Sequence, residues 1–173
     1  MFKKKRLMIL FVAYCFIALR AVRAGEDPGG KTDPALHIDV PTKLEKANVV
    51  IDFGHLAFGG DMPYALGDIR LLATDVRDWN TKSQIVVIFH GDAAYLVLND
   101  NAYNTNRRVI TGIPYKGLLT EMMKLGVQLE LCGATAKSNH WGNANLLSGI
   151  KVNVNAMVRL TQLEQEGYTM IYQ

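Results

Sequence analysis

Short apolar runs alternate with amphipathic stretches along most of the chain. The runs 48–53, 84–89 and 127–131 are rich in Val, Ile and Leu, which is typical of strands. Further strands are expected at 150–154 and 168–171. Helices are expected at 63–79, 114–125 and 156–166, with a short helix at 92–98 and a weaker helix or turn leading to Asn145. This βαβα alternation predicts a three-layer α/β domain with a mainly parallel sheet.

Two segments refine this pattern. The run Ile85 to Phe89 is continuously apolar, as expected of a strand buried on both faces of a parallel sheet. Residues 99–108 have little apolar periodicity and many turn-forming side chains, which predicts an exposed loop.

The N-terminus has the pattern of an export signal. Four basic residues, 3–6, precede thirteen apolar residues, 7–19, and the small-residue cleavage site Val22-Arg23-Ala24 follows. We expect cleavage after Ala24 and export through the inner membrane to the periplasm, with no membrane attachment afterwards. The apolar run is short for a spanning helix, which needs about 20 residues. An uncleaved signal anchor is the alternative.

The rest of the chain divides into an arm and one domain. Residues 25–43 contain Pro28-Gly29-Gly30 and Pro34, which favour an extended arm or linker. Residues 44–173 are long enough to bury a core of their own. The expected organisation is therefore a signal peptide at 1–24, an arm at 25–43 and a single α/β domain at 44–173.

Charge and composition limit the classes of partner that the protein is expected to bind. The whole chain has a net charge of +3 and 49% hydrophobic residues, an ordinary globular balance. Residues 1–24 hold six of the 19 basic residues and none of the 16 acidic ones, so the mature chain has 13 bases against 16 acids, or −3. Nucleic acid is a poor candidate partner, because no basic stripe remains beyond Arg107-Arg108.

Signal cleavage also changes the cysteine count. Of the two cysteines, Cys15 lies in the signal, so Cys132 remains alone and no internal disulfide is possible. A single cysteine in an oxidising compartment suggests an intermolecular bond, a reactive thiol or a buried small hydrophobic residue.

Three expected strands end in residues capable of chemistry. The ends read Asp52-Phe53-Gly54-His55, His90-Gly91-Asp92 and Cys132-Gly133-Ala134-Thr135. Open parallel sheets bind ligands beyond the carboxyl ends of their strands. If the three strands are neighbours, His55, His90 and Cys132 approach one another at one edge.

Cys132 has a physical reason to be reactive at that edge. A thiol that precedes a helix feels the positive end of the helix dipole and accepts hydrogen bonds from free amides, and both favour the thiolate. Lys137 and His140 are candidate sources of further positive charge, or else solvated surface side chains. Gly133 leaves room for a partner molecule, and it equally suits a tight strand-to-helix turn.

The two strand-end histidines, His90 and His55, are candidates for different roles. His90 is a candidate proton donor or hydrogen-bond partner, since imidazole titrates close to neutral pH. The alternative is a half-buried histidine that caps backbone groups. His55 is a weaker candidate for substrate binding.

The chain resembles the DsrE/DsrF-like family, particularly its exported members. The resemblance lies in His90-Gly91-Asp92 after an apolar strand and in the segments 126–133, 145–152 and 160–168, taken in that order and spacing. It extends over about residues 49–172.

This resemblance implies a DsrE-like, flavodoxin-like α/β fold and assembly into trimers or hexamers. It also implies a cysteine that carries sulfur as a persulfide in some members, and that cysteine corresponds to Cys132. A Cys132 thiolate would accept a sulfane sulfur and pass it to a thiol of a partner protein or a small sulfur compound. Such a protein is a sulfur carrier or a sulfurtransferase, and its site requires no metal and no nucleotide cofactor.

Two other function classes remain open. Cys132 with His90 and His55 would suit copper or zinc, which makes a metal or redox-ligand binder the first alternative. The second is a non-catalytic oligomeric interaction module in which Cys132 is simply packed.

Overall fold

The computed structural model describes residues 37–173. The predicted signal peptide at 1–24 and residues 25–36 of the predicted arm lie outside the described residues. Residues 41–173 form one compact unit. Among the residues described, none of the helices has the length and apolar character needed to cross a membrane.

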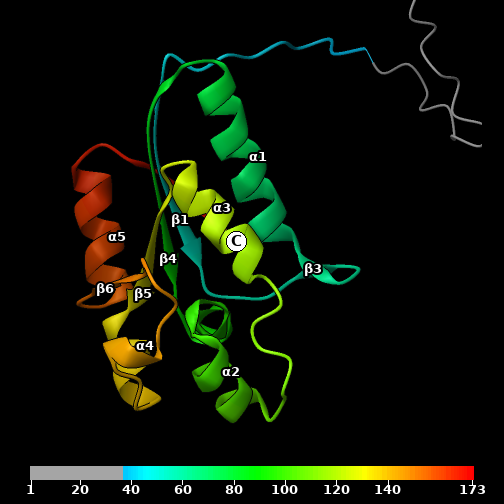
Figure 1. Ribbon diagram of the computed structural model, residues 1–173. Coiled ribbons are helices and arrows are strands. Elements are labelled where there is room, and N and C mark those ends of the chain that lie inside the picture. Colours follow the sequence, from blue (N-terminus) through cyan, green and yellow to red (C-terminus); the bar gives the residue numbers. More distant parts are fainter. Residues whose placement is uncertain (1–36) are drawn as a thin grey trace, which may run out of the picture. The chain divides into compact units, whose positions relative to one another are not determined.

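Five parallel strands form the central sheet (Figure 1). They are β1 (Lys46–Phe53), β4 (Lys82–Phe89), β5 (Gln128–Cys132), β6 (Lys151–Asn153) and β7 (Thr169–Tyr172). Their order is β6-β5-β4-β1-β7, and every neighbouring pair is parallel. The predicted α/β fold with a mainly parallel sheet is confirmed.

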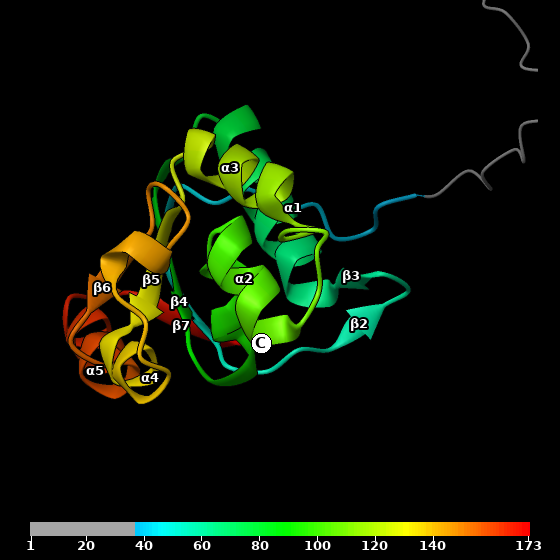
Figure 2. The same ribbon diagram turned by 60° about the horizontal axis from the view of Figure 1, so that its bottom comes forward.

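The connections place the helices unequally on the two faces. The long helices are α1 (Tyr64–Asp78), α3 (Lys116–Lys124) and α5 (Ala156–Gln165). α1 and α3 lie on one side of the sheet and α5 lies on the other, in both views (Figures 1 and 2). The chain steps from β1 through β4 and β5 to β6, then returns past β1 to β7. A right-handed return crossover must use the opposite face, so α5 occupies that face.

Shorter elements complete the unit. They are the hairpin strands β2 (Phe58–Gly59) and β3 (Met62–Pro63), the helices α2 (Asp100–Arg107) and α4 (Gly133–Ser138), and the 3-10 helices η1 (Gly91–Val97) and η2 (Asn143–Asn145). The hairpin was not predicted from the sequence, and the short helix expected at 92–98 is of the 3-10 type.

The exposed loop predicted at 99–108 is wrong, because α2 lies there. The Asn99 side chain caps this helix by accepting a hydrogen bond from the Ala102 backbone N–H at 2.9 Å. Arg108 ends it in the left-handed conformation, with φ 56°. The prediction failed because α2 buries only Ala102, so its sequence lacks an apolar stripe.

Each face of the sheet has its own apolar core. Odd-numbered β1 residues such as Ile51 and Phe53 pack with α1 and α3, while Val50 packs with Leu160 and Leu163 of α5. Ile85 to Phe89 are all buried, as predicted for a strand covered on both faces. The α5 face has the smaller core, since α5 is the one long helix that covers it among residues 37–173.

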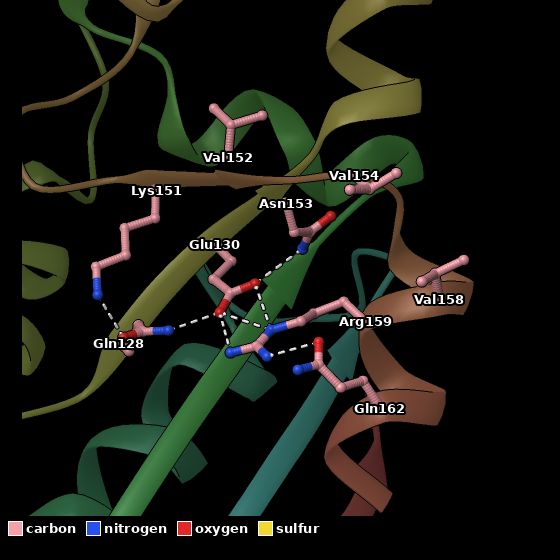
Figure 3. Close-up of a pocket in the computed structure, with 9 residues that line it drawn as sticks. All are labelled: Gln128, Glu130, Lys151, Val152, Asn153, Val154, Val158, Arg159 and Gln162. Atoms are coloured by element: carbon pink, nitrogen blue, oxygen red, sulfur yellow. Dashed lines mark hydrogen bonds and ion pairs between the residues drawn. The ribbon is translucent and has the colours of Figure 1, made fainter. Parts of the chain in front are cut away.

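Glu130 of β5 lies on the α5 face and is only 3% exposed. Arg159 of α5 reaches across to it (Figure 3). The Arg159 Nη2 and Nε groups donate to Glu130 Oε1 at 3.0 and 3.1 Å. This forked ion pair ties α5 to the sheet.

Neighbouring amides complete the environment of Glu130. Gln128 Nε2 donates to Oε1 at 2.6 Å, and Asn153 Nδ2 donates to Oε2 at 3.0 Å. Burial raises the pKa of Glu130, but the hydrogen bonds from Arg159, and then those from the two amides, outweigh it and lower the pKa below its usual value. Lys151 joins the network by donating to Gln128 Oε1 at 2.6 Å. The pocket drawn in Figure 3, about 350 Å³ in volume, is lined by this network.

Replacing Arg159→Met is expected to lower the free energy of unfolding by about 3 kcal/mol, because Glu130 would keep a buried charge without its partner. Urea denaturation at neutral pH measures this. The matched control is Arg70→Met, which removes an exposed ion pair to Glu121 at 3.8 Å and should cost less than about 1 kcal/mol. Equal losses in the two variants would contradict a structural role for the buried pair.

Candidate functional site

The carboxyl edge of the sheet gathers polar side chains on the α5 face. Side chains alternate between faces along a strand, so Asp52 shares the face of Val50, and Cys132 shares that of Glu130. His90 follows β4 at the position level with Cys132, since Phe89 pairs with Leu131. Three neighbouring strands therefore present a carboxylate, an imidazole and a thiol to the same side.

These three side chains border one cavity of about 530 Å³. Its other lining residues come from α4 and from the start of α5, and they are mainly apolar. They are Ala134, Thr135, Asn155, Ala156, Met157, Val158 and Leu160. Sheet edge, α4 and α5 thus enclose a single space with the thiol on its wall.

Cys132 is the last residue of β5 and immediately precedes α4. Its side chain is 5% exposed, and its Sγ accepts a hydrogen bond from the Ala156 backbone N–H at 3.2 Å. Burial raises the pKa of the thiol. Hydrogen bonds from the Thr135 hydroxyl and from the N–H groups of Thr135, Ala156 and Ala134 outweigh burial, so the pKa lies below its ordinary value.

His90 contacts Asp52 directly. Its Nε2 lies 2.5 Å from Asp52 Oδ1, and the two side chains are 30% and 18% exposed. The His90 ring lies over Gly54, where a Cβ would come within 2.4 Å of the ring Cε1. Gly91 has φ +50°, and a Cβ there would lie 2.7 Å from the Gly54 carbonyl oxygen. The two glycines therefore permit the close approach that sets the imidazole beside the carboxylate.

The DsrE/DsrF-like family model matches residues 49–172. The chain belongs to the DsrE/DsrF-like family. This family is linked to sulfur relay, and the match covers every residue that borders the cavity. No match is found among curated proteins.

Two solved structures support the DsrE-like fold. The ychN protein from E. coli matches with a TM-score of 0.54 and 15% identity, over 73% of this chain and 99% of that one. The protein of unknown function MTH1491 from Methanobacterium thermoautotrophicum matches with a TM-score of 0.50 and 18% identity, over 74% of this chain and 98% of that one. At such identities the likeness concerns the fold alone.

Within this DsrE-like domain, the sequence-predicted residues separate into two groups. Cys132 and His90 border the same cavity. Gly133 and Lys137 border a different one, of about 280 Å³, on the side of Trp141. Gly133 is required by close packing, because a Cβ would lie 2.3 Å from the Asn153 carbonyl oxygen.

The remaining two predicted residues lie apart from the thiol cavity. His55 follows β1 and is exposed. His140 ends the α4 segment with φ 58° and is also exposed. Neither side chain borders the cavity of Cys132. Their substrate-binding roles stay predictions without geometric support.

Sequence reasoning missed Asp52 and Thr135 as site residues. Both stand in the strand-end segments that the sequence singled out, but neither was given a role. Alternation along β1 places Asp52 on the face of Val50, a signal that requires knowing which face carries the site. Thr135 lies three positions after Cys132, one turn into α4, where its hydroxyl can return to the sulfur.

The arrangement suits thiol chemistry. A hydrogen-bonded thiol with a lowered pKa lines the same cavity as an imidazole and a carboxylate. Within residues 37–173, no group of three or more His, Cys, Asp or Glu side chains is arranged to hold a metal ion. The hydrogen bonds to the Cys132 sulfur and its place on the cavity wall favour nucleophilic attack by sulfur.

Replacing Thr135→Val is expected to raise the pKa of the Cys132 thiol, because the thiolate loses a hydroxyl donor. The thiolate absorbance near 240 nm, followed against pH and corrected with Cys132→Ser, measures this. Thr120→Val removes a hydroxyl that bonds to the Lys116 carbonyl on α3, and it should leave the titration unchanged. An unchanged titration in Thr135→Val would show that the hydroxyl does not stabilise the thiolate.

Proposed function

We propose that this protein handles sulfur in the periplasm by accepting a sulfane sulfur on Cys132 and passing it on. The observation that carries the proposal is the hydrogen-bonded, low-pKa thiol on the wall of a cavity of about 530 Å³. Family membership supports it, since the DsrE/DsrF-like family is linked to sulfur relay.

The thiolate would attack a sulfane sulfur and hold it as Cys132-S-SH. A thiol of an acceptor protein or small molecule would then take the sulfur and regenerate the Cys132 thiolate. Because the Cys132 side chain is only 5% exposed, the cavity is the route by which a donor reaches it. His90 is the nearby group that can exchange a proton with the sulfur compounds. Whether the cycle is catalytic or stoichiometric, the same residues serve.

Mature wild-type protein treated with inorganic polysulfide should gain the mass of one sulfur atom per chain. The reason is that Cys132 is the only thiol left after the signal. Intact-mass spectrometry measures the gain, and a thiol reductant should remove it.

Cys132→Ser is the matched control, and it should gain nothing. The proposal fails if wild type gains no sulfur, or if Cys132→Ser gains as much. Protein unfolded in urea provides a second comparison, since a folded site should load faster at pH 6 than an unfolded thiol with an ordinary pKa.

Export and assembly are further parts of the proposal, and both rest on the sequence. Protein recovered from the periplasm should begin at Gly25, as determined by intact mass.

The mature protein should also sediment as a trimer or hexamer. Exposed apolar side chains just before and at the start of α5, Val154, Met157 and Val158, support contact with other chains, because they are 56–76% exposed. A mass that includes residues 1–24, or a monomer at micromolar concentration, would overturn the respective part.

A further inference from the structure

We propose that Asp52 is a positioning residue, which holds the His90 imidazole so that it exchanges protons with the sulfur compound at Cys132. This inference rests on the sulfur-handling function proposed above. It assigns a role to a carboxylate that the sequence did not single out and that borders the same cavity as the thiol.

Asp52 occupies a position where a carboxylate is costly. It lies in β1, between β4 and β7, and follows the buried residues Val49, Val50 and Ile51. A carboxylate with 18% side-chain exposure needs a polar partner to offset its loss of water. In the described part of the chain, the hydrogen bond to His90 is the one that the Asp52 side chain makes.

The geometry also fixes which nitrogen of His90 remains for a ligand. The ring is fixed by three contacts: Gly54 beneath it, the carboxylate at Nε2, and the His90 backbone N–H bonded to the Phe53 carbonyl at 3.1 Å. With Nε2–H donating to the carboxylate, the proton that can be exchanged is the one on Nδ1. Among residues 37–173, Nδ1 makes no hydrogen bond, and the imidazole borders the cavity of the thiol.

The proton balances the transfer. The Cys132 thiolate attacks the outer sulfur of a donor R–S–SH, so a bond from Cys132 Sγ to that sulfur forms as the R–S to sulfur bond breaks. The electron pair goes to R–S⁻, which takes the Nδ1 proton of the His90 imidazolium. The products are Cys132-S-SH, R–SH and neutral His90. Formally, Cys132 Sγ loses two electrons and is oxidised, and the R–S sulfur of the donor gains them and is reduced. An acceptor thiol reverses the step and returns the proton to Nδ1.

The test compares the rate of sulfur loading with its extent. Mature Asp52→Asn and His90→Gln are mixed with inorganic polysulfide at pH 7, and intact mass is followed in time under single-turnover conditions. Each variant should load at least tenfold more slowly than wild type and reach the same final mass. Asp92→Asn makes the same chemical change at an exposed residue outside the cavity, and it should load at the wild-type rate.

A double-mutant cycle separates positioning from a general structural effect. If Asp52 acts through His90, the variant carrying both Asp52→Asn and His90→Gln should load no more slowly than His90→Gln alone. The inference would be overturned if adding Asp52→Asn to His90→Gln slowed loading by about the same factor as Asp52→Asn slows it in the wild type. Asp52→Glu keeps the carboxylate, and it should recover part of the rate that Asp52→Asn loses.

Nitrogen NMR provides a readout that is independent of sulfur transfer. In ¹⁵N-histidine-labelled wild type, neutral His90 should carry its proton on Nε2, and Asp52→Asn should lose this preference while the other histidine signals stay in place. An unchanged tautomer together with wild-type loading in Asp52→Asn would overturn the inference. Wild type that gains no sulfur under any condition would instead overturn the proposed function, because the tautomer result stands apart from loading.

Discussion

The ion pair between Glu130 and Arg159 is the interaction on which the site depends. It joins β5 to α5, the one long helix on its face of the sheet. The cavity has strand ends for one wall and the start of α5 for another, so its shape depends on where α5 lies. Apolar packing through Leu160 and Leu163 is non-directional, whereas a forked ion pair fixes both position and rotation. The Glu130–Arg159 ion pair therefore sets the position of α5, and the apolar core stabilises α5 in that position.

The same pair lies close to the thiol along β5. Glu130 lies two residues before Cys132 on the same face of β5, which places the two roughly 6–7 Å apart along the strand. An unpaired carboxylate at that distance would disfavour a second negative charge. In this structure Glu130 is paired with Arg159, and the lowered pKa of the Cys132 thiol comes from the hydrogen bonds that its own sulfur accepts.

The sequence predicted the elements well and the relations between elements less well. Strands such as Ile85 to Phe89 can be recognised in the sequence, because burial on both faces requires an uninterrupted run of apolar residues. The strand end at Cys132 was predicted in the same way, from the apolar run 127–131. The place of β7 beside β1 has no local signal, and α2 was missed because it buries only Ala102 and so has no apolar stripe. Arg159 and Glu130 are 29 residues apart, and no spacing rule links them.

The site itself shows the same division between local and non-local information. The thiol was found because a strand end and a following helix are contiguous in the chain. Its donors are partly contiguous, at Thr135, and partly distant, at Ala156. The groups that lower the pKa of the Cys132 thiol are hydrogen-bond donors on neutral residues, Thr135, Ala156 and Ala134. Such donors keep their orientation at any ionic strength, whereas attraction to an exposed cation is screened by salt. The lowered pKa of Cys132 thus depends on how the first residues of α4 and α5 close around the sulfur.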